Sequence, residues 1–191
     1  SKIAHSSSDI AEIRSIFSKL DEIIDLDFEE MSHPNGSEID IYSINYSSTF
    51  STNVVGQVFT QETINGAWFD VLWKDLNGKS QTTSLDKNII IHELGHALGL
   101  SHPNDDPYNL SWDTDDTVMS YNKGKSGYST WYSEADINAL ISIWGRENDN
   151  GNIDYKKNFD EYKFYNLGEN KFSIKTEIGL EDISGIDLLT F

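Results

Sequence analysis

The sequence predicts an α+β protein in which a twisted sheet of four or five strands is backed by two long helices. A smaller, irregular part is expected to end in a third helix. Capped apolar segments at helical spacing predict the helices, and segments of alternating apolar and polar residues predict the strands. The chain has 191 residues, of which 37% are hydrophobic, and this fits one domain with a small appendage. We expect a main domain over residues 1–147 and a short tail over residues 148–191.

The first predicted helix runs from Ser8, its expected N-cap, to about Leu26. Its apolar residues recur at steps of three and four, which places them on one face of a helix. They are Ile10, Ile13, Ile16, Phe17, Leu20, Ile23 and Ile24. Phe28 then begins a short extended stretch. Only residues 1–7 precede this helix in the sequence, so any strand before it is expected to be short.

Three strands are predicted between the first and second helices. The segment Glu38–Asn45 alternates between apolar and polar residues, and Asn53–Thr60 and Ala67–Lys74 are two further candidates. Asn65-Gly66 lies between the last two, and Asn77-Gly78 follows them. Both dipeptides are typical of tight turns.

The second and third helices are predicted from their start and stop signals. Thr83-Ser84-Leu85-Asp86 resembles a capping box ahead of an apolar run, and Gly99 ends that run. A loop rich in Pro, Asn, Asp and Gly covers residues 101–127. The third helix is expected from Ser133, as its cap, to Trp144, with Gly145 closing it.

The tail is predicted to contain a β-hairpin. Its strands would be Glu161–Leu167 and Lys171–Thr176, joined at Gly168-Glu169-Asn170. The polar segment Asn148–Asn152 is expected to link the tail to the main domain. Part of that segment, Asp149-Asn150-Gly151-Asn152, resembles a calcium loop faintly but lacks its spaced carboxylates.

Composition excludes several classes of function. With 14 basic and 32 acidic residues the net charge is −18, which repels nucleic acid and anionic membranes. No apolar run is long enough to span a membrane. The absence of cysteine excludes a disulfide scaffold, a thiolate zinc site and a cysteine nucleophile. A solvated acidic surface explains the charge most simply, and attraction of basic or calcium-bridged substrates is the alternative.

Three histidines with metal-ligand spacing form the strongest motif. His92 and His96 are four residues apart on the predicted second helix, so both imidazoles can reach one ion. Gly99 permits a sharp turn after that helix, and the turn directs His102 back toward the ion. Three histidines leave one tetrahedral position of zinc open for water, which indicates a catalytic site. A bare pair of histidines on a helix could be a solvated or core-capping pair, but the full pattern is much rarer.

Glu93 is the candidate catalytic base. It lies beside a ligand without being one, so it can take a proton from the zinc-activated water and pass it to a leaving amine. The site thus favours hydrolysis of internal peptide bonds.

The sequence from His92 to His102, His-Glu-Leu-Gly-His-Ala-Leu-Gly-Leu-Ser-His, resembles the extended zinc signature of the metzincin metalloproteases. Val118-Met119-Ser120-Tyr121 is similar to the clan's Met-turn. Pro103, Met119-Ser120-Tyr121 and the segment 132–145 resemble the serralysin branch, here without its calcium-binding repeat roll. The resemblance covers residues 8–145 and implies a mixed sheet above an irregular lower part, with the cleft between them and residues 1–147 as the catalytic domain.

The resemblance also implies roles that the residues alone do not establish. Met119 would form an apolar floor beneath the zinc. Tyr121 would be a fifth zinc ligand in the resting enzyme, and it would then stabilise the oxyanion when substrate binds. Without the resemblance, a methionine and a tyrosine in this loop would be interpreted as packing residues.

Other polar clusters have simpler interpretations. The loop after His102 carries five aspartates that could bind calcium as a second cofactor, although a solvated acidic loop is the preferred interpretation. They are Asp105, Asp106, Asp113, Asp115 and Asp116. His5 and His33 are expected on the surface.

The resemblance implies that the partners are protein or peptide substrates, bound in extended form along Asn53–Thr60, which would be an edge strand at the cleft; a plain edge strand without this role is the alternative. A proteinaceous inhibitor or a pro-segment is a further candidate. The chain begins with Ser1 rather than Met, so we expect a processed, secreted form that has lost an export signal or pro-segment. Two alternatives stay open: a zinc-binding pseudo-protease that serves as a binding module, and a zinc hydrolase of non-peptide amides. Glu93 argues against the first, and the edge strand argues against the second.

Overall fold

The computed structural model describes most of the chain, namely residues 2–32, 36–45, 50, 53–64, 66–75, 82–147, 152–154, 162–168, 171–175, 180–183 and 188–190. These residues form two compact units, Ser1–Arg146 and Glu147–Phe191, and each is described by itself.

A mixed four-stranded sheet forms one layer of the first unit, in the order β1-β2-β4-β3. Its strands are β1 (Lys2–Ile3), β2 (Ile39–Ile44), β3 (Gly56–Thr63) and β4 (Gly66–Lys74). β2 pairs in parallel with β4, whereas β1 and β3 run antiparallel to their neighbours. β3 is therefore an edge strand, as predicted for that part of the chain.

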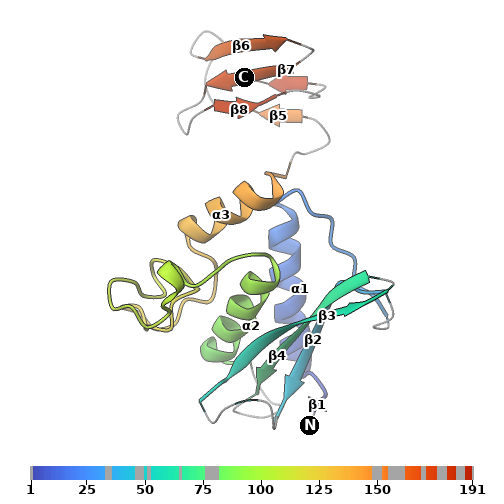
Figure 1. Cartoon of the computed structure of the whole chain (residues 1–191), viewed down its shortest axis with the longest axis vertical. Helices are drawn as coiled ribbons and strands as arrows, with labels where there is room; N and C mark the ends of the chain where they lie inside the picture. The colour runs from blue at the N-terminus through green and yellow to red at the C-terminus, as the bar shows by residue number, and fades with distance from the viewer. Residues whose placement is uncertain are drawn as a thin grey trace. The chain divides into compact units, whose positions relative to one another are not determined.

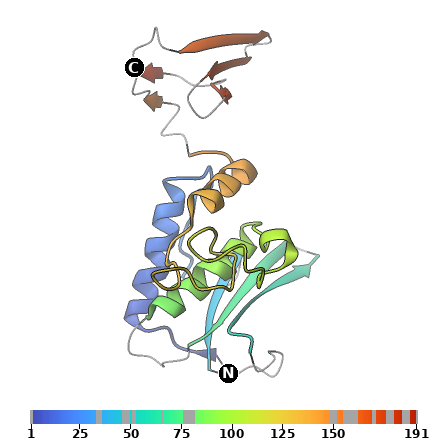
Figure 2. The same cartoon turned by 90° about the vertical axis from the view of Figure 1, so that its left-hand side faces the viewer.

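Two helices on the same side of the sheet form the second layer (Figures 1 and 2). They are α1 (Ser7–Asp21) and α2 (Ser84–Ala97). Their apolar faces and β4 enclose the core, whose fully buried members include Leu20 of α1, Trp73 of β4, and Ile90, Ile91 and Leu94 of α2. Burial of these side chains is the main stabilising contribution to the fold. The predicted α+β fold is confirmed.

The limits of α1 differ from the prediction at both ends. Ser6, not Ser8, is the N-cap, because Ser6 and Asp9 form a reciprocal capping box. The helix ends at Asp21, five residues earlier than predicted. Ile24 is nevertheless fully buried, since the chain leaves the helix and forms a β-bridge with Arg146. The apolar spacing that predicted α1 thus continues beyond the end of this helix.

The strand prediction is wrong for the limits of β3. The observed strand begins at Gly56 rather than at Asn53 and continues to Thr63, because Thr63 pairs with Gly66 across a tight turn. This register leaves residues 53–55 outside the strand, although Lys74 still donates its backbone N–H to the carbonyl of Val55 at 2.7 Å. The predicted turn at Asn77-Gly78 lies outside the described residues.

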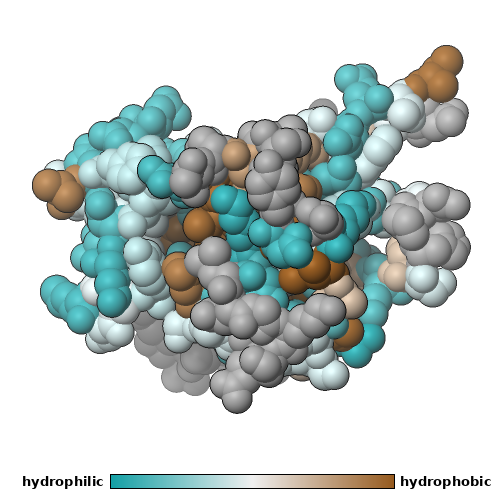
Figure 3. All heavy atoms as spheres, turned by 90° about the horizontal axis from the view of Figure 1, so that it is seen from below, coloured by the Kyte–Doolittle hydropathy of each residue, from teal (hydrophilic) through white to brown (hydrophobic). Residues whose placement is uncertain are grey.

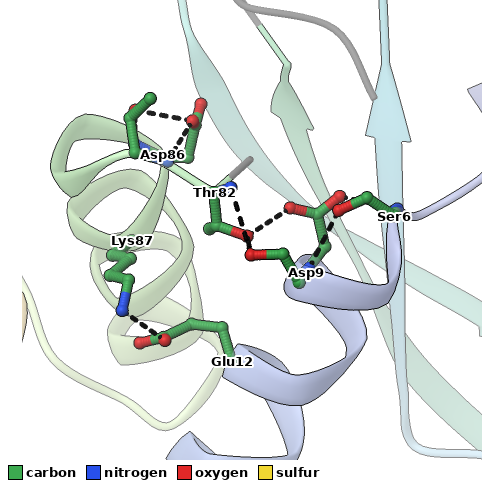
Figure 4. A network of polar contacts seen from close by, with 8 residues as sticks. Ser6, Asp9, Glu12, Thr82, Asp86 and Lys87 are labelled. Carbon is green, nitrogen blue, oxygen red and sulfur yellow. Dashed lines mark hydrogen bonds and ion pairs between the residues drawn. The ribbon is translucent and has the colours of Figure 1, made fainter. Parts of the chain in front are cut away.

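A polar network joins the N-termini of α1 and α2 (Figure 4). The Asp9 carboxylate accepts hydrogen bonds from the Ser6 N–H at 2.8 Å and from the Thr82 hydroxyl at 2.7 Å. One turn further along both helices, Lys87 forms an ion pair of 2.6 Å with Glu12. The hydrogen bonds to Asp9 lower its pKa against the opposing effect of burial. The network fixes the start of α2 relative to α1.

The irregular part of the unit follows α2 and ends in α3 (Glu134–Trp144). Ser133 caps α3 and Gly145 closes it, both as predicted. The Trp144 indole donates a hydrogen bond of 2.7 Å to the carbonyl of Leu98, just beyond α2. The part between the two helices contains one short 3-10 helix, η1 (Pro103–Asp105).

The second unit consists of short strands. β6 (Lys163–Gly168) pairs antiparallel with β7 (Lys171–Lys175), and β8 (Leu180–Asp182) adds to the other side of β7. β5 (Asn152–Asp154) and β9 (Leu188–Thr190) form a separate parallel pair. The strands β5, β8 and β9, each only three residues long, were not predicted from the sequence. Of the segment Asp149-Asn150-Gly151-Asn152, compared above with a calcium loop, residues 149–151 lie outside the described residues.

The two other histidines were expected on the surface. This prediction is wrong for His5, which is half-buried: its ring stacks on Trp73 at 5.1 Å, and its Nε2 donates to the carbonyl of Ile41 at 3.1 Å. His33 lies outside the described residues.

Hydrophilic residues predominate among the coloured residues of the lower face, with hydrophobic ones scattered between them (Figure 3). In the described part of the chain, no helix combines the length and the hydropathy needed to cross a bilayer.

Candidate active site

Helix α2 presents His92 and His96 one above the other. His92 is 4% exposed, and its Nδ1–H donates to the carbonyl of Val118 at 2.8 Å. The His96 Nδ1–H donates to the carbonyl of Leu100 at 2.9 Å. Because Nδ1 of each ring carries the hydrogen in these bonds, both Nε2 atoms present lone pairs to the same point.

His102 completes the cluster after a sharp turn. Gly99 makes this turn possible because its φ of +101° is one that residues with a side chain rarely adopt. The Nε2 of His102 lies 3.2 Å from that of His96 and 3.3 Å from that of His92. The turn therefore brings together the three histidines that the sequence singled out.

The spacing of these nitrogens fits zinc. A tetrahedral zinc with Zn–N distances of about 2.0–2.1 Å separates its nitrogen ligands by roughly 3.3 Å. Burial lowers the pKa of His92 to about 3 and also lowers the pKa values of His96 and His102. Neutral imidazoles are the form that binds metal. Among the described residues, these three histidines are the one set of at least three potential metal ligands that lie close enough together to bind a single ion.

Glu93 lies next to this cluster in a buried position. It is 6% exposed, and burial raises the pKa of its carboxyl to about 8. A cation bound at the histidines would favour the carboxylate form instead. Glu93 lines both of the cavities that border the histidines, and so does Gly56 of β3.

Met119 packs against helix α2 at Gly95. It is 1% exposed, and its sulfur lies 2.9 Å from the place that a Cβ on Gly95 would occupy. Gly95 lies between His92 and His96 in α2, so its lack of a side chain lets Met119 approach the helix. A buried carboxylate, Asp136, holds this loop by accepting hydrogen bonds from the Thr117 hydroxyl and, at 2.9 Å, from the Val118 N–H.

Tyr121 also lines both cavities beside the histidines. Its ring centroid lies 5.2 Å from that of His92 and 5.2 Å from that of His102. The ring of Tyr108 makes an edge-on contact with that of Tyr121, with 5.1 Å between the ring centroids. The Tyr121 backbone N–H donates to the carbonyl of Pro107 at 2.9 Å. Burial, followed by the charge of Glu93, raises the pKa of the phenol, so it stays protonated and able to donate a hydrogen bond.

Two cavities meet at the metal cluster. One, of about 370 Å³, follows α2 from Glu93 to Leu85, and the other, of about 460 Å³, follows β3 to Thr60. Both are lined by Val54, Gly56, Glu93 and Tyr121. A continuous cleft thus passes the three histidines on the side where β3 lies.

The aspartates of the loop after His102 mostly stabilise the loop itself. Asp113 accepts a hydrogen bond from the Asp115 N–H at 2.7 Å, and Asp116 accepts one from the Asp113 N–H at 3.1 Å. Asp115 accepts a hydrogen bond from the Lys125 N–H at 3.0 Å, and Asp106 accepts one from the Tyr108 N–H at 3.0 Å. Such contacts are typical of acidic loops and do not require calcium.

Several residues around the site were not predicted from the sequence. Gly56 and Asn88 line the cleft, and Asp136 anchors the loop that carries Met119. Asp136 had a signal, since it is the third residue after the cap Ser133 and forms the capping box there. Gly56 and Asn88 belong to no motif, and only the fold shows that they line the same cavity as Glu93.

Comparison with known proteins agrees with this geometry. No curated protein matches the chain. The family model of the matrixins (Peptidase_M10) matches residues 2–110, which is more than half of the chain and includes all three histidines. The chain therefore belongs to the matrixin family of metzincin zinc endopeptidases, and its three converging histidines bind the catalytic zinc.

Proposed function

We propose that Glu93 is the general base and Tyr121 the oxyanion donor in peptide hydrolysis. Zinc, when bound, activates water and polarises the scissile carbonyl. Glu93 accepts a proton from the attacking water and gives it to the amine as the C–N bond breaks. The position of Glu93 supports this role, because its side chain lines the cleft next to the three histidines.

The role of Tyr121 belongs to a serralysin-like mode of action, which we propose for this matrixin. The phenol would bind the zinc in the resting enzyme and move to the carbonyl oxygen of the substrate as negative charge develops there. The short distances between the Tyr121 ring and the rings of His92 and His102 support the proposal. Its raised pKa supports the protonated, donating form.

Tyr121→Phe tests this assignment. Removing one oxyanion donor typically lowers kcat by about 10²–10³ with little effect on ground-state binding. We expect a loss of this size with an unchanged zinc content. Tyr108→Phe is the matched control, because it removes a hydroxyl from the neighbouring ring and should leave kcat close to that of the wild type. A wild-type kcat in Tyr121→Phe would remove the tyrosine from the mechanism and leave the zinc peptidase intact.

The substrate is proposed to bind in extended form along β3. One side of β3 pairs with β4, and no strand of the described sheet pairs with the other. If the substrate runs antiparallel to β3, the residue after the scissile bond enters the cavity along α2. That cavity is lined by apolar and neutral polar side chains, among them Val55, Leu85, Asn88, Ile89 and Tyr128. We infer a preference for a bulky, uncharged side chain, since a charge would be desolvated there.

We also propose that the enzyme is secreted, because matrixins usually are, and that a proteinaceous inhibitor or a pro-segment can occupy the same cleft. The enzyme is acidic, with a net charge of −18. Basic residues at the margins of such an inhibitor would therefore speed its association with the enzyme.

Residues 1–147 are proposed to be the catalytic domain and residues 148–191 a dispensable tail. All side chains assigned to the site precede Gly145 in sequence, and the chain divides into compact units close to this boundary. A chain ending at Glu147 should therefore keep a kcat/KM near that of the full chain, measured on the same peptide. It should also keep its zinc. If the shortened chain folds and binds zinc but cleaves nothing, the tail contributes to the cleft and the division is wrong.

A further inference from the structure

We propose that Gly56 is a positioning residue for Glu93: its missing side chain makes the space in which the carboxylate of the base lies. This inference rests on the proposed function, because it assumes that Glu93 carries the proton. Gly56 is the first residue of the edge strand β3, and it borders both cavities of the cleft.

The space beside Gly56 is filled by Glu93. A Cβ added to Gly56 would lie 2.5 Å from Oε1 of Glu93 and 2.7 Å from its Cγ. It would also lie 2.7 Å from Cγ2 of Ile89, one turn earlier on α2. All three distances are below 3.0 Å, so an alanine at this position requires a neighbour to move.

Glu93 is the neighbour that can move. Ile89 is 4% exposed and belongs to the core, so its Cγ2 can give way only slightly. β3 is held by its pairing with β4, where Gly56 lies opposite Trp73, itself 1% exposed. The Glu93 side chain borders open cavities and can rotate away. A methyl group at Gly56 is therefore expected to displace the carboxylate.

The backbone does not explain a glycine here. Five other glycines of the described chain have a positive φ, but Gly56 does not and lies in an extended strand. Any residue could adopt this conformation. Position 56 therefore requires a glycine because a larger residue would occupy the space of the Glu93 side chain. In this way a residue of the edge strand affects the catalytic step.

The test is Gly56→Ala, measured with casein and with one peptide derived from a mapped casein cleavage. We expect about one zinc per chain and a KM within a few-fold of wild type, whereas kcat falls by about 10²-fold, because a displacement of about 1 Å in a catalytic group has this effect. A merely structural disturbance of β3 would instead raise KM, since the strand binds the substrate. Gly66→Ala is the control, because Gly66 lies in the same hairpin as Gly56. A Cβ added to Gly66 would meet no atom within 4 Å. An alanine there would be strained by its backbone alone, since φ at this position is +139°. It should lower the melting temperature without lowering kcat.

Glu93→Ala is measured in the same experiment, so that a failure of the proposed function can be distinguished from a failure of the inference about Gly56. If Glu93→Ala cleaves as fast as the wild type, the proposed function fails. If Glu93→Ala is inactive but Gly56→Ala keeps the wild-type kcat, or loses activity through KM alone, the inference about Gly56 is overturned. If Gly56→Ala does not fold, the double variant Gly56→Ala/Ile89→Ala is compared with the single variant Ile89→Ala. This pair removes the core contact but keeps the contact with Glu93, so the same fall in kcat is expected.

Discussion

Replacing His96 by alanine is expected to remove both the zinc and the peptidase activity. Its Nε2 lies 3.2 Å from that of His102, and two remaining nitrogens do not make a tight catalytic site. After dialysis against metal-free buffer, the zinc content should fall from about one ion per chain to near zero. The melting temperature should also fall toward that of the metal-free wild type, because bound zinc stabilises the folded state.

His5→Ala is the matched control for this experiment. His5 bonds to the carbonyl of Ile41 and stacks on Trp73, so its loss should lower stability but leave the zinc content unchanged. Full zinc retention in His96→Ala would contradict the ligand assignment.

Glu93→Ala is expected to keep its zinc and lose nearly all cleavage. We assign the carboxylate as the base and not as a ligand, so the three histidines are expected to hold the ion still. Loss of a general base typically lowers the rate by about 10²–10⁴. The measurement is kcat on a mapped peptide, with the zinc content determined in the same sample. Glu134→Ala, which removes an exposed carboxylate from the start of α3, should behave as the wild type.

Glu93→Ala also distinguishes an enzyme from a zinc-binding pseudo-protease. In a binding module, the wild type and Glu93→Ala would be equally inactive on every protein tested. A wild type that cleaves and a Glu93→Ala variant that does not would exclude that alternative.

The sequence predicted the parts of the fold that local signals determine. The starts of α2 and α3 follow from capping boxes at Thr83 and Ser133, and their ends follow from glycines that adopt a positive φ. The three histidines could be predicted because four residues span one helical turn and because Gly99 reverses the chain. All of these signals act within about ten residues of sequence.

The sequence could not predict features that depend on distant parts of the chain. The burial of Ile24 depends on a bridge to Arg146, and the register of β3 depends on its turn into β4. A periodic pattern reports which residues are buried, but not whether a helix or a bridge buries them. The contact between Gly56 and Glu93 joins residues 37 positions apart, so no motif could reveal it.

The cap of α1 was predicted wrongly for a different reason. Ser6, Ser7 and Ser8 are all suitable caps, and the choice depends on which serine lies three residues before a carboxylate that can reach back. Only Ser6 stands in this relation to Asp9. The signal was present in the sequence, and the spacing rule that identifies Asp86 and Asp136 would have found it.

Cleavage of denatured casein by the zinc-loaded chain, with and without chelator, tests the central claim most directly. Mass spectrometry of the products identifies each bond that is cut. The account predicts cuts at internal peptide bonds, enriched in bulky, uncharged residues just after the bond, which stop on chelation and resume when zinc is added back. A zinc-loaded, folded chain that produces no internal cuts, or cuts that continue unchanged after the zinc has been removed, would contradict it.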